Sequence, residues 1–182
     1  LMGANIASDV VEDKFCETTI GAKTDEAAQL WSLVFHSQTF QVHTVLDVVG
    51  PELCGALKNV VALAGGFSDG MNLGQSTKAA FLRLGFMEMR KFCHFFYPGR
   101  VSDETFFCSC GLADLIATCS GGRNYKCAKV FAQNPTRSWD DIERELLNGQ
   151  KLQGTGTLQE VHGFLVKRQQ EHEYPLFTTL HK

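Results

Sequence analysis

Lys58 lies in a stretch that carries very little other charge. Between residues 51 and 67, Glu52 is the only other charged side chain. Apolar surroundings disfavour the ammonium form and lower the pKa of a lysine toward the range useful for proton transfer. Lys58 is therefore a candidate general acid or base. The alternative is a lysine whose apolar stem lies along one helix face and whose charge reaches solvent.

An acid and a hydroxyl, Asp114 and Thr118, interrupt the apolar run GLADLIAT. They are four residues apart, so in a helix they share one face. On an otherwise apolar helix this pair could orient a catalytic lysine. The alternatives are a plain polar face, or a threonine bonded back to its own helix.

The segment SGGRN, residues 120–124, directly precedes a predicted helix. Paired glycines let backbone N–H groups approach a ligand closely, and a helix N-terminus favours an anion. Arg123 adds a planar fork of donors suited to phosphate oxygens. The segment predicts a phosphate site, with a simple helix–helix turn as the alternative.

Histidine and cysteine spacing gives no indication of a metal site. The six histidines are scattered, and none of the seven cysteines forms a CxxC pair. Zinc sites need closely spaced ligands, so we expect no metal. The cysteines are typical of buried free thiols in a reducing cytosol.

Three elements of an α/β domain are expected before residue 50. Residues 14–20 and 41–49 contain β-branched and aromatic stretches typical of strands. Residues 25–38 between them have helical spacing of apolar side chains. Strand, helix, strand is how the last part of an α/β domain would read.

After residue 50 the pattern is helical throughout. Pro51 suits a first helical turn, and Gly65-Gly66 predicts that this helix weakens or ends there. Further helices are predicted over residues 77–97, 103–120, 124–132, 139–147 and 157–170. The helix at 77–97 is apolar nearly all round, so we expect it to be a central buried helix. The fold class is therefore mainly α. We expect an all-α region at 51–182 that follows the last part of an α/β domain at 1–50.

Composition and charge exclude several classes of protein. The chain has 182 residues, a net charge of −3 and 44% hydrophobic residues, which is typical of a globular domain. The sequence has no basic stripe of the kind expected in a nucleic-acid-binding domain. It also has no apolar run long enough to span a membrane. The chain opens on Leu1 in the middle of a pattern, so we expect a piece of a longer protein.

Several stretches, taken in their order along the chain, make it resemble the NAD-dependent glycerol-3-phosphate dehydrogenases of the cytosolic eukaryotic type. The resemblance covers the whole chain, and it implies the last part of an incomplete Rossmann-type α/β domain at 1–50 followed by an all-α substrate domain at 51–182. The stretches that carry it are MGANIA (2–7), KFCETTIG (14–21), ELCGALKNVVA (52–62), TKAA (77–80), CGLADLI (110–116), GGRN (121–124) and ELLNGQKLQG (145–154).

The resemblance implies an oxidoreductase that interconverts glycerone phosphate and sn-glycerol 3-phosphate with NAD(H). It implies a cytoplasmic homodimer, and the aromatic-rich helix 77–97 is a candidate intersubunit face. The glycine-rich G-x-G-x-x-G turn of a nucleotide domain does not occur here. We therefore expect the nucleotide-binding half to lie upstream. We also expect the isolated chain to be inactive.

The same resemblance implies a role for individual residues. Lys58 matches the catalytic general acid and base, and Asn59, Asp114 and Thr118 match positions around the reacting carbon. Implied substrate-binding residues are Asn5, Lys58, Arg123 and Asn124. Implied cofactor-binding residues are Ala7, Arg123, Lys151 and Gln153.

The chain departs from the family pattern at four places: Ala64–Phe67, Gln75-Ser76, Ser120 and Thr155-Gly156. The lysine, aspartate, threonine and arginine positions all match. A second hypothesis is a truncated, non-catalytic paralog that binds a phosphate-bearing ligand or pairs with full-length subunits.

Overall fold

The computed structural model describes all 182 residues, which divide into two compact units. The first unit contains Leu1–Gly55 and Met89–Ile116, and the second contains Ala56–Glu88 and Ala117–Lys182. The sequence-based division at residue 50 follows chain order and stays a prediction.

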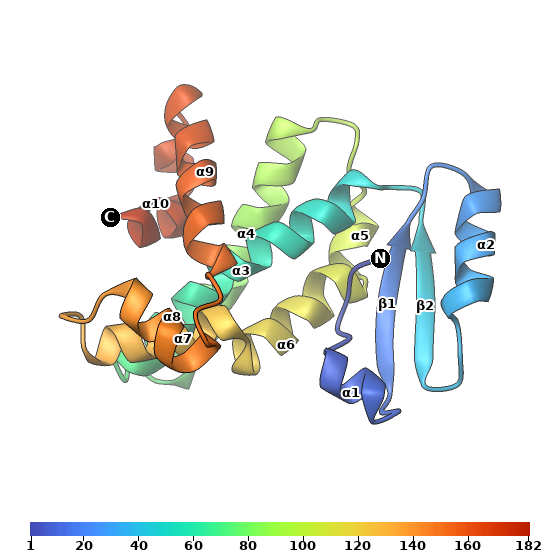
Figure 1. Cartoon of the computed structure of the whole chain (residues 1–182). Helices are drawn as coiled ribbons and strands as arrows, with labels where there is room; N and C mark the ends of the chain where they lie inside the picture. The colour runs from blue at the N-terminus through green and yellow to red at the C-terminus, as the bar shows by residue number, and fades with distance from the viewer. The chain divides into compact units, whose positions relative to one another are not determined.

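The first unit holds the only two strands, which form a parallel pair. β1 (Cys16–Gly21) pairs with β2 (Phe40–Val45) in the register Cys16↔Phe40. The crossover between them is α2 (Asp25–Phe35), which Figure 1 shows beside β2. Its N-terminus is capped by Thr24, whose hydroxyl accepts the Ala27 N–H. The strand–helix–strand prediction is confirmed.

A buried carboxylate, that of Asp47, fixes the start of the 22-residue helix that begins at Val49. Its Oδ1 accepts the Gly50 N–H at 2.8 Å in the first turn of α3 (Val49–Gly70). Its Oδ2 accepts the Ser102 N–H and the Thr105 hydroxyl, both at 2.9 Å. Thr105 belongs to α5 (Asp103–Phe107), so one side chain joins the starts of two helices.

The second unit is a set of helices with no strand. α7 (Arg123–Gln133), α8 (Trp139–Leu147) and α9 (Gln153–Lys167) follow one another closely, and α10 (Pro175–His181) lies beside α9 in Figure 1. The members of a buried apolar cluster beneath α7 and α8 are Cys127, Ile142, Leu147 and Leu152. Phe131 stacks on Trp139 at 4.4 Å along the same contact.

The prediction that Gly65-Gly66 ends a helix is wrong, because α3 continues to Gly70. A Cβ at Gly66 would lie 2.7 Å from the Ala128 Cβ and 2.9 Å from the Lys129 nitrogen. A Cβ at Gly70 would lie 2.6 Å from the Ala132 Cβ. The glycines are thus a contact surface that lets α7 approach α3 closely, which outweighs their low helix propensity.

The single helix predicted over residues 103–120 is three elements. α5 is followed by the π-helical turn η1 (Ser109–Ala113) and then by α6 (Asp114–Gly121). The Cys110 N–H donates to the Thr19 hydroxyl at 3.1 Å instead of continuing a regular helical ladder. A π-helical turn of this kind often occurs at a functional site.

Two further elements differ from the sequence-based expectation. The helix predicted at 77–97 is α4 (Gln75–Phe96), but it is not buried all round, since Leu84, Met87 and Phe95 are exposed. α10 was not predicted. Its first turn is held by the buried Glu88, whose carboxylate accepts the Leu176 and Phe177 N–H groups at 2.7 and 2.9 Å.

The fold is mainly α, as the sequence predicts. The remaining elements are the short helix α1 (Ala7–Val11) and the 3-10 turn η2 (Glu171–Glu173). None of the helices is both long enough and apolar enough to cross a bilayer.

Candidate active site

Lys58 and Asn59 lie in the middle of α3, within the second unit. Their neighbours Leu57 and Val60 are fully buried, while Lys58 itself is half-buried. Asn59 is buried. A lysine at this position has apolar neighbours around the stem of its side chain and partial access to solvent. This suits a group that must exchange protons.

The buried amide of Asn124 joins α3 to the first turns of α7 and α9. Its nitrogen donates to the Asn59 Oδ1 at 2.9 Å, and its Oδ1 accepts the Gly154 N–H at 2.9 Å. The Asn59 nitrogen in turn lies 3.4 Å from the Gln153 Oε1. Three of the predicted site residues therefore meet at one network of hydrogen bonds.

Gly154 fits this network because it has no side chain. A Cβ there would lie 2.7 Å from both the Asn124 Oδ1 and the Asn59 carbonyl oxygen. The first turn of α9 can consequently lie directly against the two asparagines.

The start of α7 forms the candidate anion site. Arg123 is the first residue of the helix and is exposed, and its cap Gly122 makes no side-chain hydrogen bond to the helix. Unpaired first-turn N–H groups and a guanidinium favour phosphate. The Arg123 Nη1 donates to the Gln150 Oε1 at 2.8 Å.

A second contact anchors α7 against the end of α3. The Asp69 Oδ2 accepts the Lys78 ammonium at 2.7 Å and also accepts the Tyr125 hydroxyl. Lys78 and then Tyr125 hold the pKa of the Asp69 carboxyl below its ordinary value. Because Tyr125 directly follows Asn124, this group holds the helix turn that carries the site.

Lys151 and Gln153 lie on either side of Leu152, where the connection between α8 and α9 ends and α9 begins. Gln153 is the first residue of α9, whose cap Leu152 makes no side-chain hydrogen bond. Lys151 pairs with Asp140 and, at 2.9 Å, with Glu143. These two carboxylates, Asp140 first, raise the pKa of Lys151 to about 12.

The other predicted residues, Asn5, Ala7 and Asp114, lie in the first unit. Ser109 links the segments that carry two of them. Its hydroxyl accepts the Ala4 N–H at 3.1 Å and donates to the Glu17 carbonyl oxygen at 2.9 Å. Ser109 opens η1, and η1 leads directly into Asp114, which is buried.

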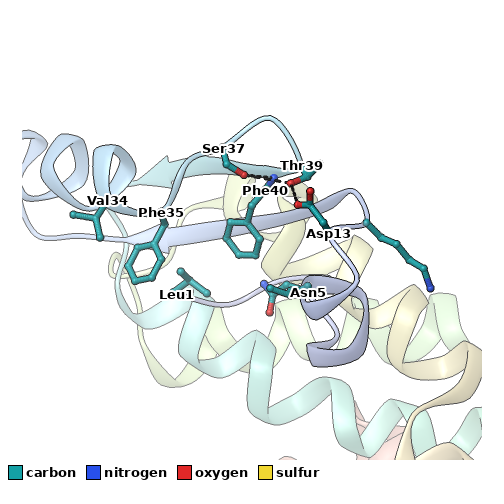
Figure 2. A pocket seen from close by; sticks show the side chains of 10 residues that line it. Leu1, Asn5, Asp13, Val34, Phe35, Ser37, Thr39 and Phe40 are labelled. Atoms are coloured by element: carbon teal, nitrogen blue, oxygen red, sulfur yellow. Dashed lines mark hydrogen bonds between the residues drawn. The ribbon is translucent and has the colours of Figure 1, made fainter.

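Asn5 also lines a pocket of about 440 Å³ in the first unit. Figure 2 shows Leu1 and Asn5 on one side of it, with Phe35 and Phe40 facing them. The Asn5 nitrogen lies 3.4 Å from the Glu17 carbonyl oxygen. Ala7 is exposed and begins α1. Asp114 and Thr118 both lie in α6, so their spacing along one helix is as predicted.

Sequence reasoning missed the residues that support the site. Gly154, Asp69, Tyr125 and Glu143 are ordinary helix residues in the sequence, and their contacts come from positions far away along the chain. The only signal available in the sequence was a glycine, Gly154, directly beside Gln153, a predicted cofactor-binding residue.

We predict that Gly154→Ala destabilises the fold, because the new Cβ must displace both asparagines. The expected loss in the free energy of unfolding is about 1–3 kcal/mol, as for overpacking elsewhere. Urea denaturation measures it. The matched control is Gly156→Ala two residues later, where the Cβ meets open space. This control should gain about 0.5–1 kcal/mol from helix propensity. Equal effects of the two substitutions would contradict the packing account.

We also predict that Asp69→Asn weakens the fold at neutral pH but not in acid. A carboxyl with a lowered folded-state pKa stabilises the fold above its unfolded pKa of about 3.9 and loses this contribution as pH falls further. The variant should be about 1–3 kcal/mol less stable at pH 7, with the gap narrowing below pH ~4. Tyr125→Phe should show a smaller effect with the same trend. A constant gap in denaturation from pH 7 to pH ~2.5 would exclude this linkage.

Comparisons with known proteins agree with the resemblance. A family model described as the NAD-dependent glycerol-3-phosphate dehydrogenase C-terminus matches residues 47–182. The cytoplasmic glycerol-3-phosphate dehydrogenase [NAD(+)] of Rattus norvegicus is 50% identical over 182 residues, covering 100% of this chain and 52% of that protein. The glycerol-3-phosphate dehydrogenase [NAD(+)] of Cuphea lanceolata is also 50% identical, with 100% and 49% covered.

Solved structures extend the similarity to the fold. The Plasmodium falciparum glycerol-3-phosphate dehydrogenase matches with a TM-score of 0.95 and 41% identity, covering 100% of this chain and 51% of that one. The chain thus spans about half the length of the relatives that it matches. It belongs to the family of the NAD-dependent glycerol-3-phosphate dehydrogenase C-terminus.

Proposed function

We propose that this chain supplies the substrate-binding and proton-transfer half of a NAD-dependent glycerol-3-phosphate dehydrogenase. The observation that carries the proposal is the meeting of the α7 and α9 N-termini at Asn59, next to Lys58. A phosphate-binding helix end and a half-buried lysine on adjoining helices suit a small phosphorylated carbonyl substrate.

The proposed reaction reduces the C2 carbonyl of glycerone phosphate. NADH, when bound, supplies the hydride that C2 receives. The Lys58 ammonium donates its proton to the carbonyl oxygen, giving sn-glycerol 3-phosphate, and takes it back in the reverse direction. A proton donor at this oxygen is needed because negative charge develops there in the transition state. Asn59, Asp114 and Thr118 would position the lysine and the reacting carbon.

Arg123, Asn124 and Asn5 would hold the substrate. A phosphate dianion is stabilised by the Arg123 fork and by first-turn N–H groups of α7, including that of Asn124. The side chain of Asn124 is already engaged with Asn59 and Gly154, so its backbone is the group available to an anion.

Ala7, Arg123, Lys151 and Gln153 would contact the dinucleotide. The uncapped first turn of α9 beside Gln153 fits a polar, anionic cofactor. The sequence contains no G-x-G-x-x-G turn, so the remaining contacts to NAD require a nucleotide-binding domain. We place the end of such a domain at residues 1–50 and the substrate domain at 51–182.

We further propose a cytoplasmic homodimer. Relatives that are 50% identical carry the word cytoplasmic in their names. Leu84, Met87 and Phe95 are exposed apolar side chains of α4. If α4 is the intersubunit face, sedimentation should give twice the chain mass, and Met87→Glu should reduce it to the monomer mass.

The alternative of a non-catalytic binding module is not favoured. The chain retains the lysine, the aspartate, the threonine and the arginine of the proposed site. Most of the proposed site residues of the second unit belong to one hydrogen-bonded network or lie next to it in the sequence.

Lys58 is tested in a protein that contains both halves. This chain replaces the matching segment of the Rattus norvegicus enzyme, and NADH oxidation with glycerone phosphate is followed. Lys58→Ala should lower kcat by about 10²–10⁴-fold, the usual contribution of acid–base catalysis. Lys58→Arg should not restore it, because arginine keeps the charge but does not release a proton.

The matched control is Lys167→Ala, a lysine in the last turn of α9. It should leave kcat and KM unchanged. Near-normal kcat in Lys58→Ala would overturn the role of the lysine.

A further inference from the structure

Glu143 is a buried acid that contacts three positions of the connection between α8 and α9. This connection, residues 148–152, is called the cofactor loop below. The backbone carbonyl of Glu143 accepts the Gly149 N–H at 3.1 Å. Its Oε1 accepts the Leu152 N–H at 2.9 Å, and its Oε2 lies 2.9 Å from the Lys151 ammonium. One residue therefore fixes the loop at its start and at its end.

The contacts of the Glu143 side chain are those of a structural acid rather than a surface acid. Its side chain is 6% exposed, whereas that of Lys151 is 72% exposed. A buried carboxylate is costly unless it is paired and hydrogen-bonded. Here an exposed lysine covers the carboxylate from the solvent side, and a backbone N–H satisfies it from within.

The backbone of the loop takes an uncommon conformation at its start. Asn148 and Gly149 both have positive φ, 50° and 80°, as the chain leaves α8. Fixing the backbone of a residue costs about 1–2 kcal/mol of conformational entropy. The carboxylate offsets part of this cost at Leu152, directly before the first turn of α9.

The loop also reaches the candidate anion site. Gln150 accepts a hydrogen bond from Arg123, and Leu152 caps the helix that begins with Gln153. The position of the loop thus determines where Gln153 and the α9 N-terminus lie.

We propose that Glu143 is a positioning residue that holds the cofactor loop in its binding shape through the Leu152 N–H. The inference rests on the proposed function for the identity of the ligand, NAD(H). The geometric part, a loop ordered by one buried carboxylate, is independent of any turnover.

Two substitutions separate the reach of the side chain from its charge. Glu143→Asp keeps the charge but is one methylene too short for Leu152. Glu143→Gln keeps an oxygen at the same reach but removes the charge. Amide hydrogen exchange at Leu152 should become about 10–100-fold faster in Glu143→Asp, as expected for a lost hydrogen bond to a charged group. In Glu143→Gln the exchange rate should stay within about threefold of that in the unsubstituted protein. The Ala128 amide in α7 serves as the internal reference for an intact fold.

The second readout uses the protein in which this chain replaces the matching segment of the rat enzyme. Glu143→Asp should raise the KM for NADH about 10-fold while kcat at saturation stays within about twofold, because the loop binds cofactor and does not touch the reacting atoms. The matched control is Glu145→Asp on the same helix, whose exposed carboxylate pairs with Arg137. It should change neither readout.

Unchanged exchange at Leu152 in Glu143→Asp would overturn the proposal, whatever the enzyme does. Faster exchange with an unchanged KM for NADH would overturn the link to cofactor. If the hybrid protein shows no turnover even without a substitution, the proposed function fails, and the exchange experiment still decides whether Glu143 orders the loop.

Discussion

The buried amide of Asn124 is the contact on which the geometry of the site depends. It joins the middle of α3 to the first turns of α7 and α9, which are distant along the chain. Buried amides that lose one partner leave the other polar groups unsatisfied, so such a network is either complete or strongly unfavourable. The positions of Lys58, Arg123 and Gln153 are therefore linked, because Gln153 belongs to this network and the other two lie next to a residue of it.

The network is possible only because α7 approaches α3 closely. Gly66 and Gly70 remove the side chains that would keep Ala128 and Ala132 away. The group of Asp69, Lys78 and Tyr125 then fixes the same helix next to its candidate anion site. Packing and polar contacts act on one helix from two directions, and together they set where its N-terminus lies.

Most helices could be predicted from the sequence, because apolar periodicity and stop signals are local properties. Trp139–Leu147 is an example, since Asn148 and Gly149 end the helix as expected. Predictions were wrong where a distant segment decides the outcome. Gly66 reads as a helix stop until α7 covers it, and the π-helical turn η1 depends on the hydroxyl of Thr19.

The site residues show the same difference between local and distant information. Lys58 and Arg123 stand out because their types are unusual in their surroundings or lie beside glycines. Glu143 lies in an amphipathic helix rich in acids, where one buried carboxylate cannot be told from its exposed neighbours by sequence. Its function as a support becomes visible only when the chain has turned back to place Leu152 against it.

Arg123 and Lys151, two of the basic residues of the second-unit site, differ in how available their charges are. Lys151 lies between the carboxylates of Asp140 and Glu143, so a phosphate would have to compete with two negative charges for it. Arg123 is exposed and donates to the neutral amide of Gln150, which an anionic oxygen can replace at little cost. Of these two cations, Arg123 therefore has the charge that is more available to a ligand, whereas the charge of Lys151 is already paired with two carboxylates.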